Sequence, residues 1–155
     1  LALILAGKVG SNVASEIGTM RVTEQIDALE IMGINSASYL ILPKIIAAVL
    51  INPFLVIISM FLAFIGGWLA GLLSGVVSTY TYVYGIQYDF EPFGITYALI
   101  KTAFFAFAIT SIPAYHGYYT KGGALEVGRS STKGVVYSSI VILIMNYVLT
   151  QLLLI

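Results

Sequence analysis

Long stretches without a charged residue dominate the pattern of this chain. They cover residues 45–88, 102–120 and 134–155. About 20 apolar residues cross a bilayer as a helix, so each stretch can hold a membrane span. We predict spans at residues 44–75, 93–115 and 132–154, with Ser130 or Ser131 capping the last one.

The first fifteen residues are also mostly apolar, and we interpret their opening as the end of another span. The chain has no initiator Met and begins inside an apolar run, so we expect that N-terminal sequence precedes it. A composition of 59% hydrophobic and 9% charged residues is typical of membrane proteins. The pattern predicts an all-α integral membrane protein with about four transmembrane helices, the first one partial, in a single domain over residues 1–155.

One segment interrupts this apolar pattern. Five of the fourteen charged side chains lie within fifteen residues: Glu16, Arg21, Glu24, Asp27 and Glu30. On a helix, the last three would form one acidic stripe. The opposite face would carry Val22, Ile26, Leu29 and Met32. At about 20 Å such a helix is too short to span a bilayer, so we predict a short amphipathic helix at residues 20–33, ended by Gly33.

Two roles fit this amphipathic helix, namely anchoring on the membrane surface and docking of a partner protein. Surface anchors usually present Lys and Arg to anionic lipid, whereas this polar face is acidic and has only Arg21 nearby. We therefore favour docking, with Ile31 as an apolar anchor for the partner. The expected docking residues are Arg21, Val22, Glu24, Gln25, Ile26, Asp27, Leu29, Glu30, Ile31 and Met32.

The distribution of Lys and Arg predicts the orientation of the spans. Basic residues flank the first and third connections, at Lys8, Arg21, Lys44, Lys121, Arg129 and Lys133. The middle connection carries only Asp89 and Glu91. By the positive-inside rule, the first and third connections are cytoplasmic and the middle one is outside. The middle connection includes the Tyr-rich segment 78–93, which we interpret as an interfacial loop or short re-entrant piece, although its alternating tyrosines could also form a strand.

Small residues recur at every fourth position in the first long span. They are Ser59, Ala63, Gly67, Gly71 and Gly75. This spacing leaves a smooth groove on one helix face, against which another backbone can pack closely. The groove fits either a subunit interface or packing within the chain, and we favour packing within the chain.

Three polar residues lie at membrane depth or at its edge, namely Glu16, Lys101 and Asn146. A charge at the centre of a bilayer costs about 3 kcal/mol on insertion scales, so such residues usually face a cavity or a partner. Lys101 could attract a lipid phosphate, hold the helices in register, or extend toward Asp89 or Glu91 at the outer surface. The residues alone leave these alternatives open.

Two widely separated segments are distinctive, namely AGKVGSNVASEIGTMRVTEQIDALEIMGINSASYLILPK and GYYTKGGALEVGRSSTKGVVYSSIVILIMNYVLT. Both resemble the MlaE/YrbE family of ABC-transporter permeases. The resemblance implies a homodimeric inner-membrane permease that works with two ABC ATPase subunits and an extracytoplasmic MCE-type protein. It also implies phospholipid or a related lipid as cargo, and a cytoplasmic coupling helix at Met20–Met32 that sits in a cleft of the ATPase.

The chain also departs from this family. The resemblance implies additional N-terminal sequence, roughly a third of a typical member, so we expect this chain to be a fragment. Many relatives carry an acid where this chain has Asn146, so a charge pair at that place is not expected here.

Other function classes find little support in the residues. Gly123–Ser130 reads like a phosphate-binding loop, but it follows a membrane span and has Arg129 in place of the Lys. We therefore expect no cofactor on this chain, with ATP and Mg²⁺ on the partner ATPase. There are no cysteines and His116 is the only histidine, so we expect no metal site. No nucleophile–base pair and no carboxylate pair is placed for acid–base chemistry, so we expect no catalytic residues. A net charge of zero gives no reason to expect nucleic acid. The remaining alternatives are an ion-coupled secondary transporter and a non-transporting membrane scaffold.

Overall fold

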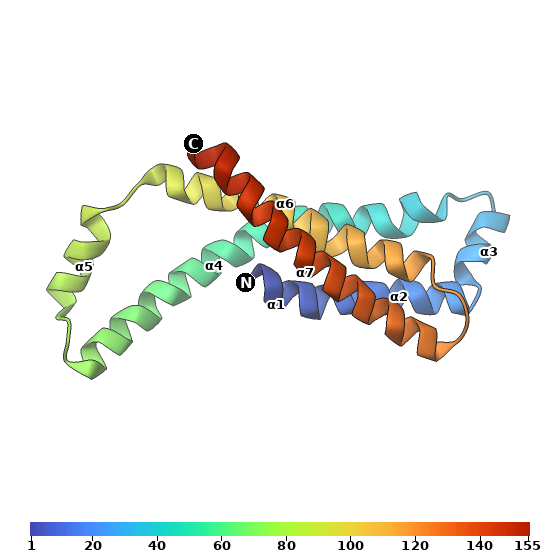
Figure 1. Ribbon diagram of the computed structural model, residues 1–155, viewed down its shortest axis with the longest axis horizontal. Helices are drawn as coiled ribbons and strands as arrows, with labels where there is room; N and C mark the ends of the chain where they lie inside the picture. The colour runs from blue at the N-terminus through green and yellow to red at the C-terminus, as the bar shows by residue number, and fades with distance from the viewer.

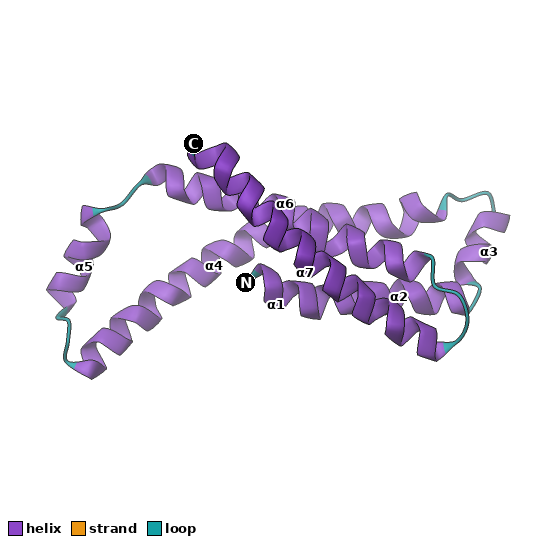
Figure 2. Ribbon diagram, viewed as in Figure 1, coloured by secondary structure: helices purple, strands orange, loops and turns teal.

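The computed structural model describes residues 1–155 and consists of helices joined by short connections, without strands (Figure 2). The helices are α1 (Ala2–Leu5), α2 (Ser11–Val22), α3 (Gln25–Ile31), α4 (Leu42–Ser74), α5 (Thr79–Tyr88), α6 (Pro92–Tyr118) and α7 (Ala124–Leu154). Two π-helical turns, Ala6–Gly10 and Ala37–Ile41, lead into α2 and α4. The all-α fold predicted from the sequence is confirmed.

Three helices are long and apolar enough to cross a membrane. They comprise Ala37–Ser74, which includes α4 and the π-helical turn before it, together with α6 and α7. Pro43 and Pro92 lie in the first turns of α4 and α6, where a missing backbone N–H costs little. The protein is therefore a multi-pass membrane protein.

The first helical stretch runs without interruption from Ala2 through the π-helical turn to Val22. It lies along α6 and α7 (Figure 1), and its side chains Val13, Ala14 and Ile17 are buried in the bundle. The stretch is longer than the partial span expected at residues 1–15. Consequently, the first three residues of the helix predicted at 20–33 belong to α2.

Glycines allow α2, α6 and α7 to pack closely. A Cβ added at Gly117 would lie 2.6 Å from the carbonyl oxygen of Ala14, and one added at Gly134 would lie 3.0 Å from the Cα of Pro113. Backbones can approach this closely only where no side chain intervenes. The three helices therefore form one tightly packed bundle around Pro113.

Helix α7 begins at Ala124, well before the predicted start at residue 132. Neither Ser130 nor Ser131 caps it, because its N-cap is Gly123 and both serines lie inside the helix. The Ser131 hydroxyl donates to the carbonyl of Val127, 3.1 Å away. The segment Gly123–Ser130, which resembles a phosphate-binding loop in sequence, is therefore helical from Ala124 onward.

The second half of α4 diverges from the bundle, and α5 follows its end at an angle and leads back toward α6, so that α4 and α5 form an arm (Figure 1). The Tyr-rich segment is therefore largely helical, and the alternative of a strand is wrong. Ser78 caps α5 by accepting a hydrogen bond from the Thr81 backbone N–H. Two bonds join α5 to α4: Trp68 Nε1 donates to Thr79 Oγ1 at 3.2 Å, and the Tyr82 hydroxyl donates to the Phe64 carbonyl at 2.7 Å.

Two glycines of the small-residue ladder on α4 face α5 and the connection that precedes it. A Cβ added at Gly67 would lie 2.8 Å from the Tyr82 hydroxyl, and one at Gly71 would lie 3.5 Å from Val77. Gly75 lies outside the ladder because it ends α4, with a left-handed φ of +69°. These contacts lie within one chain.

Candidate functional site

Helix α3 lies at one end of the bundle, which we call the α3 end (Figure 1). The chain turns into α3 at Thr23 and Glu24, where Glu24 adopts a left-handed φ of +61°. Such a conformation is unfavourable for a residue with a Cβ, by roughly 1 kcal/mol. The single helix predicted at residues 20–33 is therefore wrong: the region is split into the end of α2, this turn, and α3.

Ile26 anchors α3 to the bundle. Its side chain is fully buried in a cluster with Val13, Ile17 and Ala114. Leu29 is half-buried, whereas Met32 is 64% exposed at the C-cap of α3. The predicted apolar face therefore holds at Ile26 and Leu29, but Met32 lies outside it because the helix has already ended.

Arg21 connects the end of α2 to both α3 and α6. Its Nη1 donates to Asp27 Oδ1 at 3.0 Å, and its Nε donates to the Tyr118 carbonyl at 2.7 Å. The guanidinium carbon also lies 4.4 Å from the centre of the Tyr118 ring, within cation–π range. One cation thereby fixes the direction of α3 relative to two longer helices.

A second group of polar contacts joins α3 to α6. The Glu30 carboxylate accepts hydrogen bonds from the Ser36 hydroxyl at 3.1 Å and from the Tyr118 hydroxyl at 3.2 Å. The two hydroxyls are themselves 2.8 Å apart. Ser36 is almost fully buried, at 1% exposure. We refer to Arg21, Asp27, Glu30, Ser36 and Tyr118 together as the corner network.

The corner network engages two of the three acidic residues in the predicted stripe. Asp27 is engaged by Arg21, and Glu30 is engaged by two hydroxyls. Glu24 is exposed and makes no ion pair, so it is the one acid of the three that is free for a partner. Beside it, Gln25 and Ala28 are exposed, and Ile31 is 87% exposed. Such a surface of one acid and one large apolar side chain suits contact with another protein rather than chemistry.

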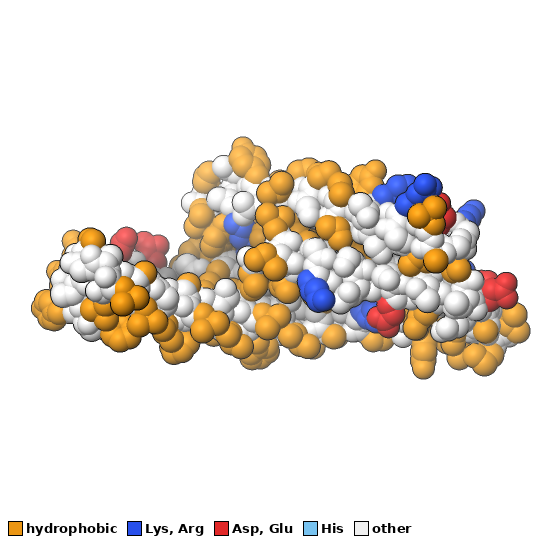
Figure 3. All heavy atoms as spheres, turned by 90° about the horizontal axis from the view of Figure 1, so that it is seen from below, with side chains coloured by type: hydrophobic (Ala, Val, Ile, Leu, Met, Phe, Trp, Pro, Cys, Tyr) orange, Lys and Arg blue, Asp and Glu red, His pale blue; other side chains and the backbone are white.

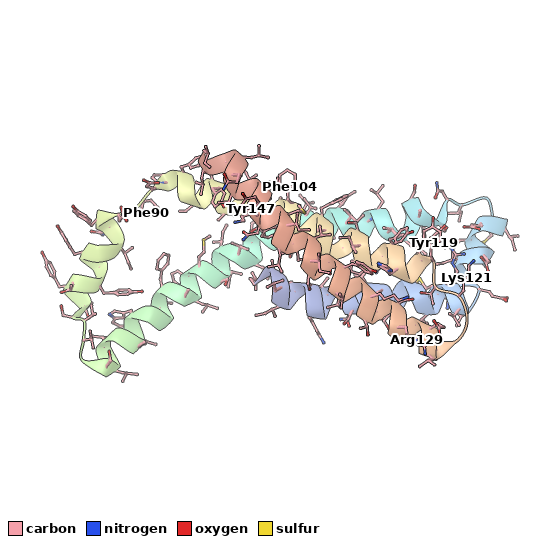
Figure 4. All side chains as sticks on the ribbon, viewed as in Figure 1. Phe90, Phe104, Tyr119, Lys121, Arg129 and Tyr147 are labelled. Carbon is pink, nitrogen blue, oxygen red and sulfur yellow. The ribbon has the colours of Figure 1, made fainter.

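The α3 end also carries basic residues. Figure 4 places Tyr119, Lys121 and Arg129 near α3, on the connection between α6 and α7 and on the first turns of α7. Figure 3 shows Lys and Arg side chains gathered at this end beside acidic ones, and a separate acidic group at the opposite end. The two ends of the molecule therefore differ in charge.

Glu16 makes an ion pair with Lys44, with 2.8 Å between Oε2 and Nζ. The pair joins α2 to α4, and both side chains are partly exposed. Glu16 therefore contributes to the packing of α2 against α4 through this ion pair.

Lys101 lies in α6 and reaches α7. Its Nζ donates to the Tyr97 hydroxyl at 2.9 Å and to Thr150 Oγ1 at 3.2 Å, and no contact joins it to Asp89 or Glu91. The cation is therefore satisfied by neutral hydroxyls between two spans. Asn146 contributes only its backbone carbonyl nearby, accepting from Thr150 at 2.6 Å, while its side chain is exposed.

Sequence reasoning missed three polar residues. Tyr118 and Ser36 belong to the corner network, and Asn52 is buried in α4, only 8% exposed. Asn52 lines a cavity of about 220 Å³ together with Thr102, Phe105 and the first turn of the chain. An Asn within an otherwise apolar run was a signal available in the sequence, whereas the contacts of Tyr118 depend on distant residues.

The chain is similar to several curated proteins. It is 45% identical over 150 residues to a probable ABC transporter permease protein of Rickettsia bellii, covering 97% of this chain and 58% of the relative. It is 36% identical over 151 residues to a probable ABC transporter permease protein of Synechocystis, covering 97% of this chain and 57% of the relative. It is also 36% identical over 159 residues to the Arabidopsis thaliana protein TRIGALACTOSYLDIACYLGLYCEROL 1, chloroplastic, covering 97% of this chain and 43% of the relative.

The chain thus spans less than three fifths of the length of these relatives. A family model described as Permease MlaE matches residues 1–152, which is nearly the whole chain. The match extends over the first helical stretch, the corner network and all three long helices. The chain therefore belongs to the MlaE permease family.

Proposed function

We propose that this chain is the membrane subunit of an ABC transporter that moves phospholipid or a related lipid. The lipid would pass between the inner membrane and an extracytoplasmic MCE-type carrier, driven by a separate ATPase. Membership of the permease family supports transport. The Rickettsia relatives named as ABC transporter permeases support an ATPase partner, and the glycerolipid in the name of the Arabidopsis relative supports a lipid cargo.

The observation that carries the proposal is the α3 end. A short helix crosses the end of the bundle, is held by Ile26 and the corner network, and leaves Glu24 and Ile31 exposed. Basic residues near this end favour a cytoplasmic location. A rigid, projecting helix on the cytoplasmic side is suited to dock in a soluble ATPase and receive its motion.

ATP and Mg²⁺ would bind to the partner. The loop-like segment Gly123–Ser130 is helical from Ala124, so its backbone N–H groups are not arranged to cradle phosphates. This chain would contribute only the docking surface and the path through the membrane.

The lipid path would need apolar walls and a few polar groups. The long helices supply extensive exposed apolar surface, on which a second copy of the chain could also pack. Lys101, Tyr97 and Thr150 form a polar group between α6 and α7 that could meet a lipid headgroup.

Docking is tested with the full-length permease and its ATPase. Ile31→Asp and Glu24→Lys change exposed groups and leave the corner network intact, so both variants should fold. We expect each variant to reduce co-purification of the ATPase about tenfold, because a buried apolar anchor or charged contact contributes about 1–3 kcal/mol to binding.

Leu125→Asp is the matched control, because Leu125 is 70% exposed on α7 at the same end but outside α3. It should retain the ATPase. Normal co-purification of the ATPase with both α3 variants would contradict the docking proposal.

Reconstitution separates the two alternatives. A complex in vesicles should transfer fluorescent phospholipid to an acceptor when ATP is added. Transfer driven instead by an ion gradient would identify an ion-coupled transporter, and no transfer under either condition would favour a scaffold.

A further inference from the structure

The geometry points to Tyr118 as the positioning residue that joins α3 to α6, so that displacement of α3 by the ATPase is carried into the membrane by α6. This inference rests on the proposed docking of the ATPase at α3. It adds that the motion passes from α3 through Tyr118 to α6.

Tyr118 holds the segment around α3 at three points. Before α3, Arg21 donates to its carbonyl and lies over its ring. Within α3, Glu30 accepts from its hydroxyl at 3.2 Å. After α3, the Ser36 hydroxyl lies 2.8 Å from the Tyr118 hydroxyl. One residue at the end of α6 therefore contacts the chain on both sides of α3 and inside it.

Two of these three contacts involve a charged partner. The Glu30 carboxylate and the Arg21 guanidinium both bind Tyr118, and hydrogen bonds to charged groups are stronger than bonds between neutral ones. Because Ser36 is almost fully buried, its hydroxyl depends on protein partners. The shortest of these contacts is the bond from Arg21 to the Tyr118 carbonyl, at 2.7 Å, whereas the Tyr118 hydroxyl shares its single proton between Glu30 and Ser36. Together they join α6 to both ends of the α3 segment, which is the connection that the inference requires.

Helix α6 is continuous from Tyr118 back to Pro92, with one backbone hydrogen bond missing at Pro113. Lys101 and Tyr118 are seventeen positions apart, which corresponds to about 25 Å of helix, so α6 joins Tyr118 directly to the level of the Lys101 group. Near its end, Gly117 packs on the Ala14 backbone and Pro113 packs on Gly134. With no space between these backbones, α2, α6 and α7 should move together when Tyr118 is pushed.

Tyr118→Phe is the first test, in the full-length complex reconstituted in vesicles. This substitution keeps the ring, its packing and the bond to the carbonyl, but it removes the hydroxyl. We expect the ATPase to remain bound and to hydrolyse ATP, while phospholipid moved per ATP falls about tenfold, as for loss of one hydrogen bond to a charged group.

Tyr119→Phe is the matched control. Tyr119 is the neighbouring tyrosine, is 61% exposed and makes no side-chain hydrogen bond. It should transport as the unmodified protein does. Unchanged phospholipid movement per ATP in Tyr118→Phe would overturn the inference.

A covalent replacement of the contact is the second test. Residues 1–155 contain no cysteine, so in Tyr118→Cys/Glu30→Cys the introduced pair supplies the only thiols of this region for a short bifunctional reagent. We expect the double variant to hydrolyse ATP with little lipid movement, and the crosslinked protein to recover coupling. A crosslinked protein no better coupled than the untreated one would overturn the inference, because a rigid join is all that it requires.

The two proposals fail differently. If the unmodified permease never retains an ATPase, the proposed function fails. If the ATPase binds and Tyr118→Phe couples normally, the proposed function stands and only the route through Tyr118 is wrong.

Discussion

The α3 end and the α4–α5 arm are both made of helices joined by a tight turn, but they are held together differently. At the α3 end, one fully buried isoleucine and a network with three charged side chains fix a seven-residue helix. In the arm, two neutral hydrogen bonds join α5 to α4, and every residue of α5 is at least partly exposed. A helix at the α3 end thus has a fixed direction, whereas the arm depends on its surroundings for packing.

Removing the apolar anchor should give the largest difference between the two regions. Ile26→Ala leaves a cavity in the cluster with Val13 and Ile17, and it should lower the free energy of unfolding by about 2–5 kcal/mol. Thermal unfolding in detergent measures this change. In the arm, Val83→Ala changes a residue that is 44% exposed and should cost less than about 1 kcal/mol. Equal losses would mean that Ile26 is not an anchor.

Filling the closest helix contact should have the next largest effect. Gly117→Ala places a Cβ where the Ala14 carbonyl oxygen would be 2.6 Å away, so α2 and α6 must separate. We expect destabilisation of about 1–3 kcal/mol, as for overpacked cores. Gly128→Ala is the control, since its Cβ would meet nothing within 4 Å, and it should be neutral or stabilising. A neutral Gly117→Ala would show that the bundle is more loosely packed than the structure indicates.

Loosening the arm should have the smallest effect. Tyr82→Phe removes one hydrogen bond to the Phe64 carbonyl, a loss of about 0.5–1.5 kcal/mol. Hydrogen–deuterium exchange of α5 should rise, while exchange at the α3 end stays unchanged. Faster exchange at both ends would show that the arm supports the bundle, contrary to the comparison.

The long apolar stretches revealed most of the fold because hydrophobicity alone marks a membrane helix. The chemistry of residues 78–93 and 124–131 was misleading. Tyrosines alternate in the first segment, and the second follows two glycines and contains Gly128, Ser130 and Ser131, yet both are largely helical. Local composition favours turns in both segments. Contacts of α5 with α4, and of α7 with α6, stabilise helices there instead.

The corner network shows why the site was harder to predict than the fold. Residues 16–33 were singled out by their charge, but the partners of Arg21 and Glu30 include Tyr118, which lies 97 and 88 residues away. No local sequence pattern identifies residues that pair over such separations in the chain. The turn at Glu24 was also missed, because a glutamate gives no sign of a left-handed conformation.

The turn at Glu24 makes one residue responsible for two properties. Its backbone sets the angle at which α3 leaves α2, and its carboxylate is the free charge of the exposed surface. Glycine or asparagine at this position would preserve the angle between α2 and α3 and remove the charge. Valine or isoleucine would also remove the charge, and a β-branched residue would disfavour the left-handed conformation on which the angle depends. Substitution of Glu24 by a small or amide side chain can therefore change the charge of the α3 end without changing the direction of α3.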